Sequence, residues 1–286
     1  MTVMYPIPNA DFRARAREAL KPVLPIALLV SLCAELPSLI SQVAATLTQE
    51  PLLDVAYQYI AHPEMELTEL ASKFSAAITP SMEAAWGLAL LAFLLTPFLN
   101  LGRLNFTLKL LRGEEIDVSD VLSRTSIFFK AIGQTLLVIF KEILWGLPGV
   151  AFSLLGIVFV LINPTAQSLN VMMGFYSVGS VLTMALMLRA ALHYCMAGLI
   201  LADRPETGVF ASVRESIAIM RHRKMLYLAL RVSFIGWILA QSIADTVLTG
   251  ISSVIGMTLG MALELLLSVY IQTSCAAFYE AYKDQP

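Results

Sequence analysis

Residues 131–162, AIGQTLLVIFKEILWGLPGVAFSLLGIVFVLI, decide the fold, because only Lys141 and Glu142 interrupt this apolar run. A helix of roughly 20 residues crosses the hydrocarbon core of a bilayer, so the run is long enough to span a membrane. The whole chain agrees, since it is 58% hydrophobic and 14% charged, against roughly 45–50% and 25% in soluble domains. The sequence therefore predicts an integral membrane protein.

Five further apolar stretches have the length of a membrane span. None shows the alternation of a transmembrane β-strand, and backbone groups that face lipid need partners within their own helix. We predict one all-α domain over residues 1–286, a polytopic transmembrane helical bundle with interfacial amphipathic helices on both faces. The expected spans are residues 22–47, 82–110, 131–162, 171–202, 225–250 and 254–279.

The distribution of basic residues predicts the orientation of these spans. With the N-terminus in the cytoplasm, only Lys73 of the nineteen Lys and Arg residues falls in a connection on the far side. Because positive charge resists translocation, we expect both termini to be cytoplasmic. The first apolar run, residues 23–47, is longer than the 7–15 residues of a signal-peptide core, so we expect it to be retained as a span.

The connection between the first two spans, residues 48–81, contains a helical pattern between Pro63 and Pro80. Its apolar members are Leu67, Leu70, Phe74, Ala77 and Ile78. This spacing predicts an amphipathic helix that lies on the outer surface of the membrane. The alternative is a short soluble cap that packs on the ends of the spans.

A weak internal repeat emerges when Arg112 is set over Arg204. The matching pairs are Glu114 and Glu206, Val118 and Phe210, Val121 and Val213, and Trp145 and Trp237. Residues 11–21 resemble a shorter third copy. The chain is thus predicted to contain three units, each an interfacial helix followed by an out-and-back helix pair. The alternative is that any membrane protein built from hairpins looks repetitive.

Four segments from residue 112 onward form a combination that is specific even though each segment is short. They are the R-G-E-E segment at 112–115, L-W-x-L-P-G at 144–149, A-D-x-P at 202–205 and S-F-I-G-W at 233–237. In these residues the chain resembles a bacterial family of multi-spanning membrane proteins catalogued only as a domain of unknown function. The resemblance implies a location in the bacterial cytoplasmic membrane, the inner one where there are two, and implies no activity.

Ionisable residues inside predicted spans are the usual place to look for function, because each is costly in lipid unless it is paired or hydrated. Arg103 lies near a cytoplasmic end and is expected to reach water. The candidates for a deeper polar cluster are Glu35, Arg189, His193 and Glu264. We hypothesise that Arg189 pairs with Glu35 or Glu264 and marks a cavity for an ion, an amphiphile or an anionic headgroup. The alternative is a buried structural ion pair.

Residues 209–224 have the pattern of an amphipathic helix at the cytoplasmic surface. Phe210, Val213, Ile217 and Met220 share one face. Basic residues lie mostly elsewhere on the helix, which is typical of a segment that faces anionic lipid. The candidate headgroup contacts are Arg214, Arg221, Arg223 and Lys224.

Several functional classes find no support in the sequence. The net charge of −2 does not favour nucleic-acid binding, and Cys33, Cys195 and Cys275 are too scattered for a zinc site or a disulfide framework. No hydrolase, nucleotide-binding or metalloprotease motif occurs, so we predict neither enzymatic activity nor a cofactor.

The favoured function is an accessory or transport-related role for a lipid or amphiphilic small molecule. The alternative is a scaffold that binds a partner protein through its basic interfacial helices, and an intramembrane enzyme is the third choice.

Overall fold

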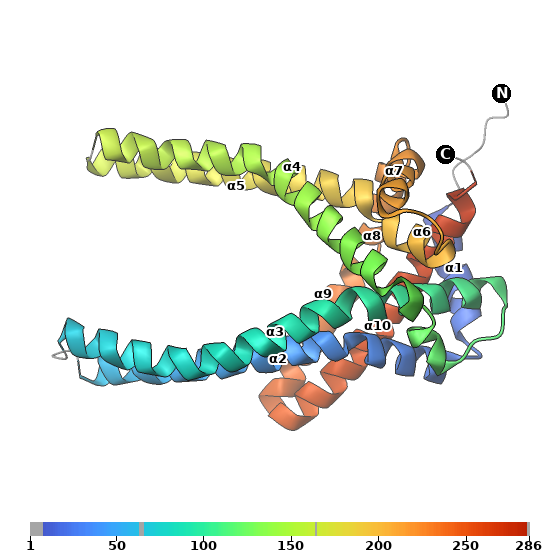
Figure 1. Ribbon diagram of the computed structural model, residues 1–286, viewed down its shortest axis with the longest axis horizontal. Coiled ribbons are helices and arrows are strands. Elements are labelled where there is room, and N and C mark those ends of the chain that lie inside the picture. The colour runs from blue at the N-terminus through green and yellow to red at the C-terminus, as the bar shows by residue number, and fades with distance from the viewer. Residues whose placement is uncertain (1–7, 63–65, 164, 285–286) are drawn as a thin grey trace.

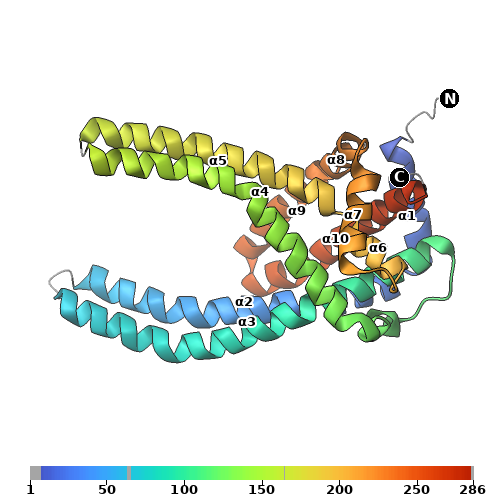
Figure 2. The ribbon, with the colours of Figure 1, turned by 45° about the horizontal axis from the view of Figure 1, so that its top comes forward.

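The computed structural model describes residues 8–62, 66–163 and 165–284. Three helical hairpins extend from a common base, and the two longest diverge like the arms of a V (Figure 1). All regular structure in these residues is helical, which confirms the predicted fold class. Helix α1 (Asn9–Leu20) and the end of α10 (Ser253–Tyr282) both lie at the base (Figure 2).

The first hairpin consists of α2 (Leu24–Ala61) and α3 (Leu67–Arg112). At 1.5 Å per residue, these helices of 38 and 46 residues are about 57 and 69 Å long, roughly twice the thickness of the hydrocarbon core. The predicted surface helix after Pro63 is therefore wrong in its placement. That segment is helical, but it forms the first turns of α3 and continues through Pro80 into the span, because packing against α2 overrides the local break.

The second hairpin follows two short 3₁₀ helices at the base. Its elements are η1 (Val118–Leu122), η2 (Thr125–Ile127), α4 (Phe128–Ile162), α5 (Ala166–Tyr194) and α6 (Ala197–Asp203). Helix α4 changes direction part-way along (Figure 1), and Pro148 lies inside it, a usual cause of a bend. Helices α4 and α5 approach so closely that a Cβ on Gly149 would lie 2.3 Å from Thr183 Oγ1.

The third hairpin is the shortest. Its elements are α7 (Val209–Met220), α8 (Lys224–Val232), α9 (Ile235–Ile251) and α10. Two predicted spans are interrupted in the structure. The expected helix at 171–202 stops at Tyr194 before α6, and the expected helix at 225–250 is divided between α8 and α9.

The arrangement agrees with the predicted three units. Helices α1 and α7 are each followed by a turn of three residues, 21–23 and 221–223, before an outgoing helix begins. The 3₁₀ helices take the corresponding place ahead of α4. Each unit thus consists of a short helical element at the base and an out-and-back pair.

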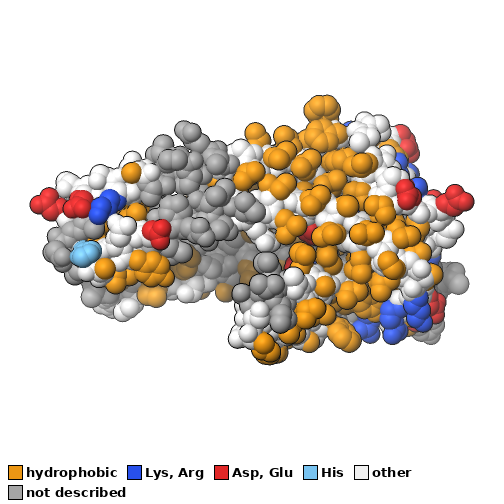
Figure 3. Space-filling view, turned by 90° about the horizontal axis from the view of Figure 1, so that it is seen from below, with side chains coloured by type: hydrophobic (Ala, Val, Ile, Leu, Met, Phe, Trp, Pro, Cys, Tyr) orange, Lys and Arg blue, Asp and Glu red, His pale blue; other side chains and the backbone are white. Residues whose placement is uncertain are grey.

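The best-packed part of the protein is the base. Fully buried side chains there include Met196, Ile200, Leu230, Phe234, Phe278 and Tyr279. The hairpins instead expose many large apolar side chains. On the face of the molecule shown in Figure 3, apolar side chains cover much of the part close to the base. Among the residues that the structure describes, six segments are long and apolar enough to cross a membrane, so lipid is the natural solvent of this surface.

Candidate functional site

The interruption between α5 and α6 positions the candidate site. An interrupted helix frees backbone groups that lipid cannot satisfy, and side chains from neighbouring helices bind them here. The Ser216 hydroxyl on α7 donates to the His193 carbonyl oxygen (2.8 Å) and accepts from the Met196 N–H (3.2 Å). The Gln134 amide on α4 donates to the Ala197 carbonyl oxygen (2.7 Å). These contacts fix the end of α5.

Trp145 of α4 supports the charged end of α5. The Arg189 guanidinium lies over its indole ring, with 5.5 Å between Cζ and the ring centroid. The same indole stacks on the His193 ring, with centroids 5.9 Å apart and planes at 22°, and its Nε1–H donates to the Tyr194 hydroxyl (3.2 Å). A cation–π contact holds an arginine without neutralising it. Arg189 is therefore held in place with its positive charge still uncompensated.

His193 joins the end of α5 to the start of α8. Its Nδ1 lies 2.9 Å from the Arg189 carbonyl oxygen, so Nδ1 carries the proton and donates to that oxygen. The other ring nitrogen, Nε2, is then an acceptor and receives a hydrogen bond from Lys224 Nζ. This contact holds the Lys224 ammonium close enough to the Arg189 guanidinium for the two positive charges to repel each other.

A cavity of about 460 Å³, here named the cationic pocket, lies where α5 meets the α7–α8 corner. Its basic lining residues are Arg189, Arg221, His222 and Lys224. Its apolar walls are Ala185, Leu188 and Leu192 from α5 and Met225 and Leu228 from α8. No carboxylate lines the pocket, and within the described ranges neither Arg189, Arg221 nor Lys224 forms an ion pair. Positive charge beside apolar walls is the complement of an anionic amphiphile.

The pocket and His193, which lies beside it and binds Lys224, combine residues that the sequence placed in two separate groups. Arg189 and His193 were expected in a deep polar cluster, whereas Arg221 and Lys224 were expected at the membrane surface. The structure brings all four together, because α5 ends at Tyr194 and Arg189 lies little more than one turn from that end. Arg189 is therefore closer to the base than a continuous span over 171–202 implied.

The other two members of the predicted cluster lie elsewhere. Glu35 Oε1 accepts from the Arg103 guanidinium (2.9 Å), so Glu35 has a different partner from the expected Arg189. The reason is topological, since α2 and α3 form one hairpin and α5 belongs to the other arm. Arg103 is also not the expected surface anchor, because only 17% of its side chain is exposed. Glu264 lines a separate cavity, to which Arg103 also contributes.

The two remaining headgroup candidates do not line the cationic pocket. Arg214 is exposed on α7, and the Arg223 guanidinium lies over the Tyr282 ring with 4.8 Å between Cζ and the centroid. The apolar face of α7 also differs from the expectation. Val213 and Met220 are buried against other helices of the protein and do not face lipid.

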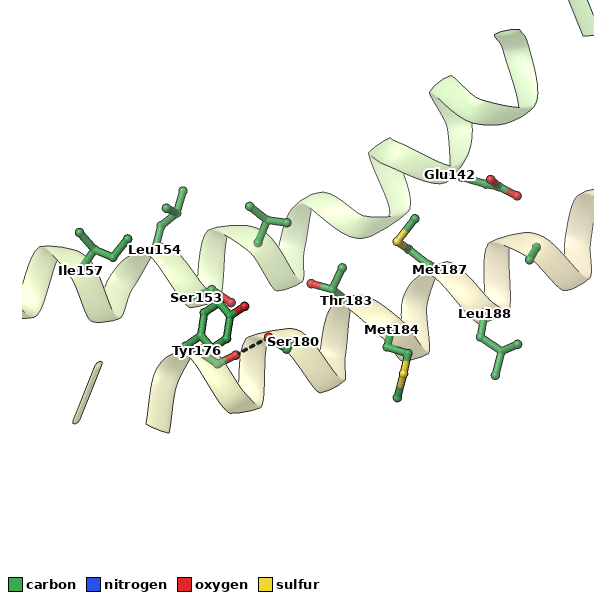
Figure 4. A pocket seen from close by; sticks show the side chains of 12 residues that line it. Glu142, Ser153, Leu154, Ile157, Tyr176, Ser180, Thr183, Met184, Met187 and Leu188 are labelled. Carbon is green, nitrogen blue, oxygen red and sulfur yellow. Dashed lines mark hydrogen bonds between the residues drawn. The ribbon is translucent and has the colours of Figure 1, made fainter. Parts of the chain in front are cut away.

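Two larger cavities lie elsewhere. One of about 780 Å³ runs between α4 and α5 (Figure 4), and its walls are apolar apart from Glu142 at one end and a few hydroxyls. Among these, the Ser180 hydroxyl is already bound, because it donates to the Tyr176 carbonyl oxygen (2.7 Å). The other, a groove of about 700 Å³, lies beside α1 against α9 and α10 and includes Arg13 and Arg17.

A family model matches almost the whole chain, residues 8–285, and its description is "Protein of unknown function (DUF975)". The chain belongs to this family. Membership of DUF975 confirms the resemblance carried by the four sequence segments. With the six apolar helices it identifies a multi-pass membrane protein, and the family description assigns no activity. No curated protein and no solved structure gives a significant match.

Proposed function

We propose that the protein binds an anionic amphiphile in the cationic pocket, as an accessory or transport-related component of a bacterial cytoplasmic membrane. The observation that supports this proposal most strongly is the composition of the cavity beside Arg189. Three cationic side chains and no carboxylate line that cavity. The Trp145 and His193 contacts hold Arg189 and Lys224 in place without compensating their charge.

The chemistry of the pocket favours a phosphate or carboxylate headgroup with a hydrocarbon chain. Like charges held close together repel one another, and an anion between them relieves that repulsion. Arg189 and Arg221 can each offer two parallel donors to a phosphate. The chain of the ligand would lie along Leu188 and Leu192 of α5 and Leu228 of α8, where it is shielded from water.

A scaffolding role through the basic helix α7 has less support. Its apolar face already packs against α4, α5 and α6, so a partner protein would find mainly Arg214, Phe210 and the polar edge of the helix. We propose no catalytic step.

We also propose that the base faces the cytoplasm. Both α1 and the α7–α8 corner, with most of their basic residues, lie there, and positive charge is retained on the cytoplasmic side. The acidic tip of the α2–α3 hairpin would then lie outside.

Mass spectrometry of the lipids that co-purify with the protein tests the proposal. We expect the wild-type protein to retain an anionic lipid and the Arg189→Gln variant to retain about tenfold less, since a charge-assisted hydrogen bond contributes about 1.5–3 kcal/mol. Arg214→Gln is the matched control, because it removes the same charge from an exposed site outside the pocket. Equal amounts of anionic lipid in all three proteins would refute the proposal.

A further inference from the structure

The three hairpins meet at a second polar cavity, of about 410 Å³, here named the central pocket. Every unit contributes to its wall. The polar lining includes Asn100 from α3, Cys195 from the α5–α6 interruption, Arg231 from α8, Gln241 from α9, and Glu264 and Gln272 from α10. The cavity is open on one side, and the Arg231 and Glu264 side chains are exposed in it. A polar cavity lined by helices of all three units is the usual position of a solute site in a membrane protein.

Two opposite charges in this pocket lack an ion-pair partner. Arg103 also lines it, but Glu35 neutralises that guanidinium. Arg231 and Glu264, in contrast, take part in no salt bridge with any residue of the described ranges. An ionised group at membrane depth costs several kcal/mol unless it is paired or hydrated, so both sites favour a charged partner.

The two charged residues lie at different levels along α10. Arg231 interacts with Cys275, whereas Glu264 precedes Cys275 by eleven residues on the same helix, α10. At 1.5 Å per residue, the backbones of Glu264 and Cys275 are about 16.5 Å apart along the helix axis. Gln272 lies on α10 between those levels, and Gln241 faces the pocket from α9, so amide groups are available along its length.

We propose that the central pocket binds a small, elongated, peptide-like zwitterion. Its anionic group would meet Arg231, its cationic group would meet Glu264, and the Gln241 and Gln272 amides would bind hydrogen-bonding groups between them. Allowing about 3 Å for a hydrogen bond at each end, the two charges of the ligand are about 10 Å apart. A fully extended tripeptide has about this length.

This site is separate from the function proposed above. The central pocket and the cationic pocket have no lining residue in common. One can therefore fail while the other stands, because Arg189→Gln leaves every residue of the central pocket unchanged.

Calorimetric titration of the purified full-length protein with triglycine tests the proposal. We expect triglycine to bind about tenfold or more tightly than N-acetyl-triglycine, which lacks the cation, or triglycine amide, which lacks the anion. Glycine, which is too short to reach both charges, is expected to bind as weakly as the blocked peptides. These comparisons use the wild-type protein only, so they remain decisive even if a variant fails to fold.

Two variants then assign the ends of the ligand. Glu264→Gln should weaken the binding of triglycine and leave the weak binding of N-acetyl-triglycine unchanged. Arg231→Gln should also weaken the binding of triglycine, and it should leave the weak binding of triglycine amide unchanged. Asp245→Asn is the control, because it removes an acidic charge of the same hairpin outside the pocket. No binding of triglycine, or equal binding of free and blocked peptides, would overturn the proposal.

Discussion

Arg112 at the end of α3 forms an ion pair with Asp203 at the end of α6, with 2.6 Å between the guanidinium nitrogen and the carboxylate oxygen. The same guanidinium binds Glu280 near the end of α10, and the Tyr279 hydroxyl donates to Asp203 (3.1 Å). The returning helices of all three units are thus tied together at the base. Gly113 follows at φ 70°, a left-handed conformation that ends α3 and that glycine adopts without strain. The R-G-E-E and A-D-x-P segments therefore meet at a structural junction.

Replacing Arg112 should destabilise the whole base. In Arg112→Met the Asp203 and Glu280 carboxylates lose their shared partner, and we expect a loss on the order of 2 kcal/mol, seen as a clear fall in the thermal unfolding midpoint in detergent. Lys73→Met is the control, because it removes an exposed pair with Glu69 and should change stability by less than about 0.5 kcal/mol. Similar midpoints for the two variants would mean that the junction contributes little.

Gly102 is predicted to be intolerant of any side chain. A Cβ at this position would lie 1.8 Å from the Val121 carbonyl oxygen, so Gly102→Ala must displace η1 from α3, at a cost of about 3 kcal/mol. Gly87→Ala on the same helix has open space around its Cβ and should keep or slightly raise the unfolding midpoint. A stable Gly102→Ala protein would contradict the close approach of η1 and α3.

Ser216→Ala should loosen the interruption between α5 and α6. It leaves the Met196 N–H and the His193 carbonyl without their side-chain partner, which we expect to cost about 1–3 kcal/mol. Retention of anionic lipid should also fall, because His193 positions Lys224. Ser242→Ala removes a hydroxyl that only contacts the backbone of its own helix, and it should change neither quantity.

Cysteine labelling in intact cells tests the orientation. Cysteines introduced by Ile60→Cys and Leu70→Cys lie near the tip of the first hairpin and should react with a membrane-impermeant reagent. Cysteines introduced by Val118→Cys and Gly208→Cys lie at the base and should react only after the membrane is permeabilised. Reaction at position 208 in intact cells would reverse the proposed topology.

Much of the fold follows from local properties of the sequence. Apolar length locates six spans, and the alternation of short basic segments with apolar pairs indicates three units. The continuous α2–α3 hairpin is different, because Pro80 suggests a break that only packing between the two helices removes. Local signals therefore predict which segments are helical better than where a helix ends.

The candidate site could be predicted only in part. Its basic residues are conspicuous in the sequence, but the end of α5 at Tyr194 lies within an apolar run and depends on Ser216 and Gln134 from other helices. When that interruption is not foreseen, the sequence places Arg189 too deep in the membrane and predicts an ion pair with Glu35 or Glu264. The role of Trp145 likewise depends on how α4 packs against α5, which no short-range pattern encodes.

Photo-crosslinking gives the most direct test of the cationic pocket. An anionic phospholipid with a photoreactive group in its acyl chain is added to the purified protein, and the labelled peptides are identified by mass spectrometry. We predict labelling of residues 185–192 and 225–228, and its loss in Arg189→Gln but not in Arg214→Gln. Labelling concentrated on α1, α9 and α10, or equal labelling of 185–192 in all three proteins, would contradict an anionic lipid site at Arg189.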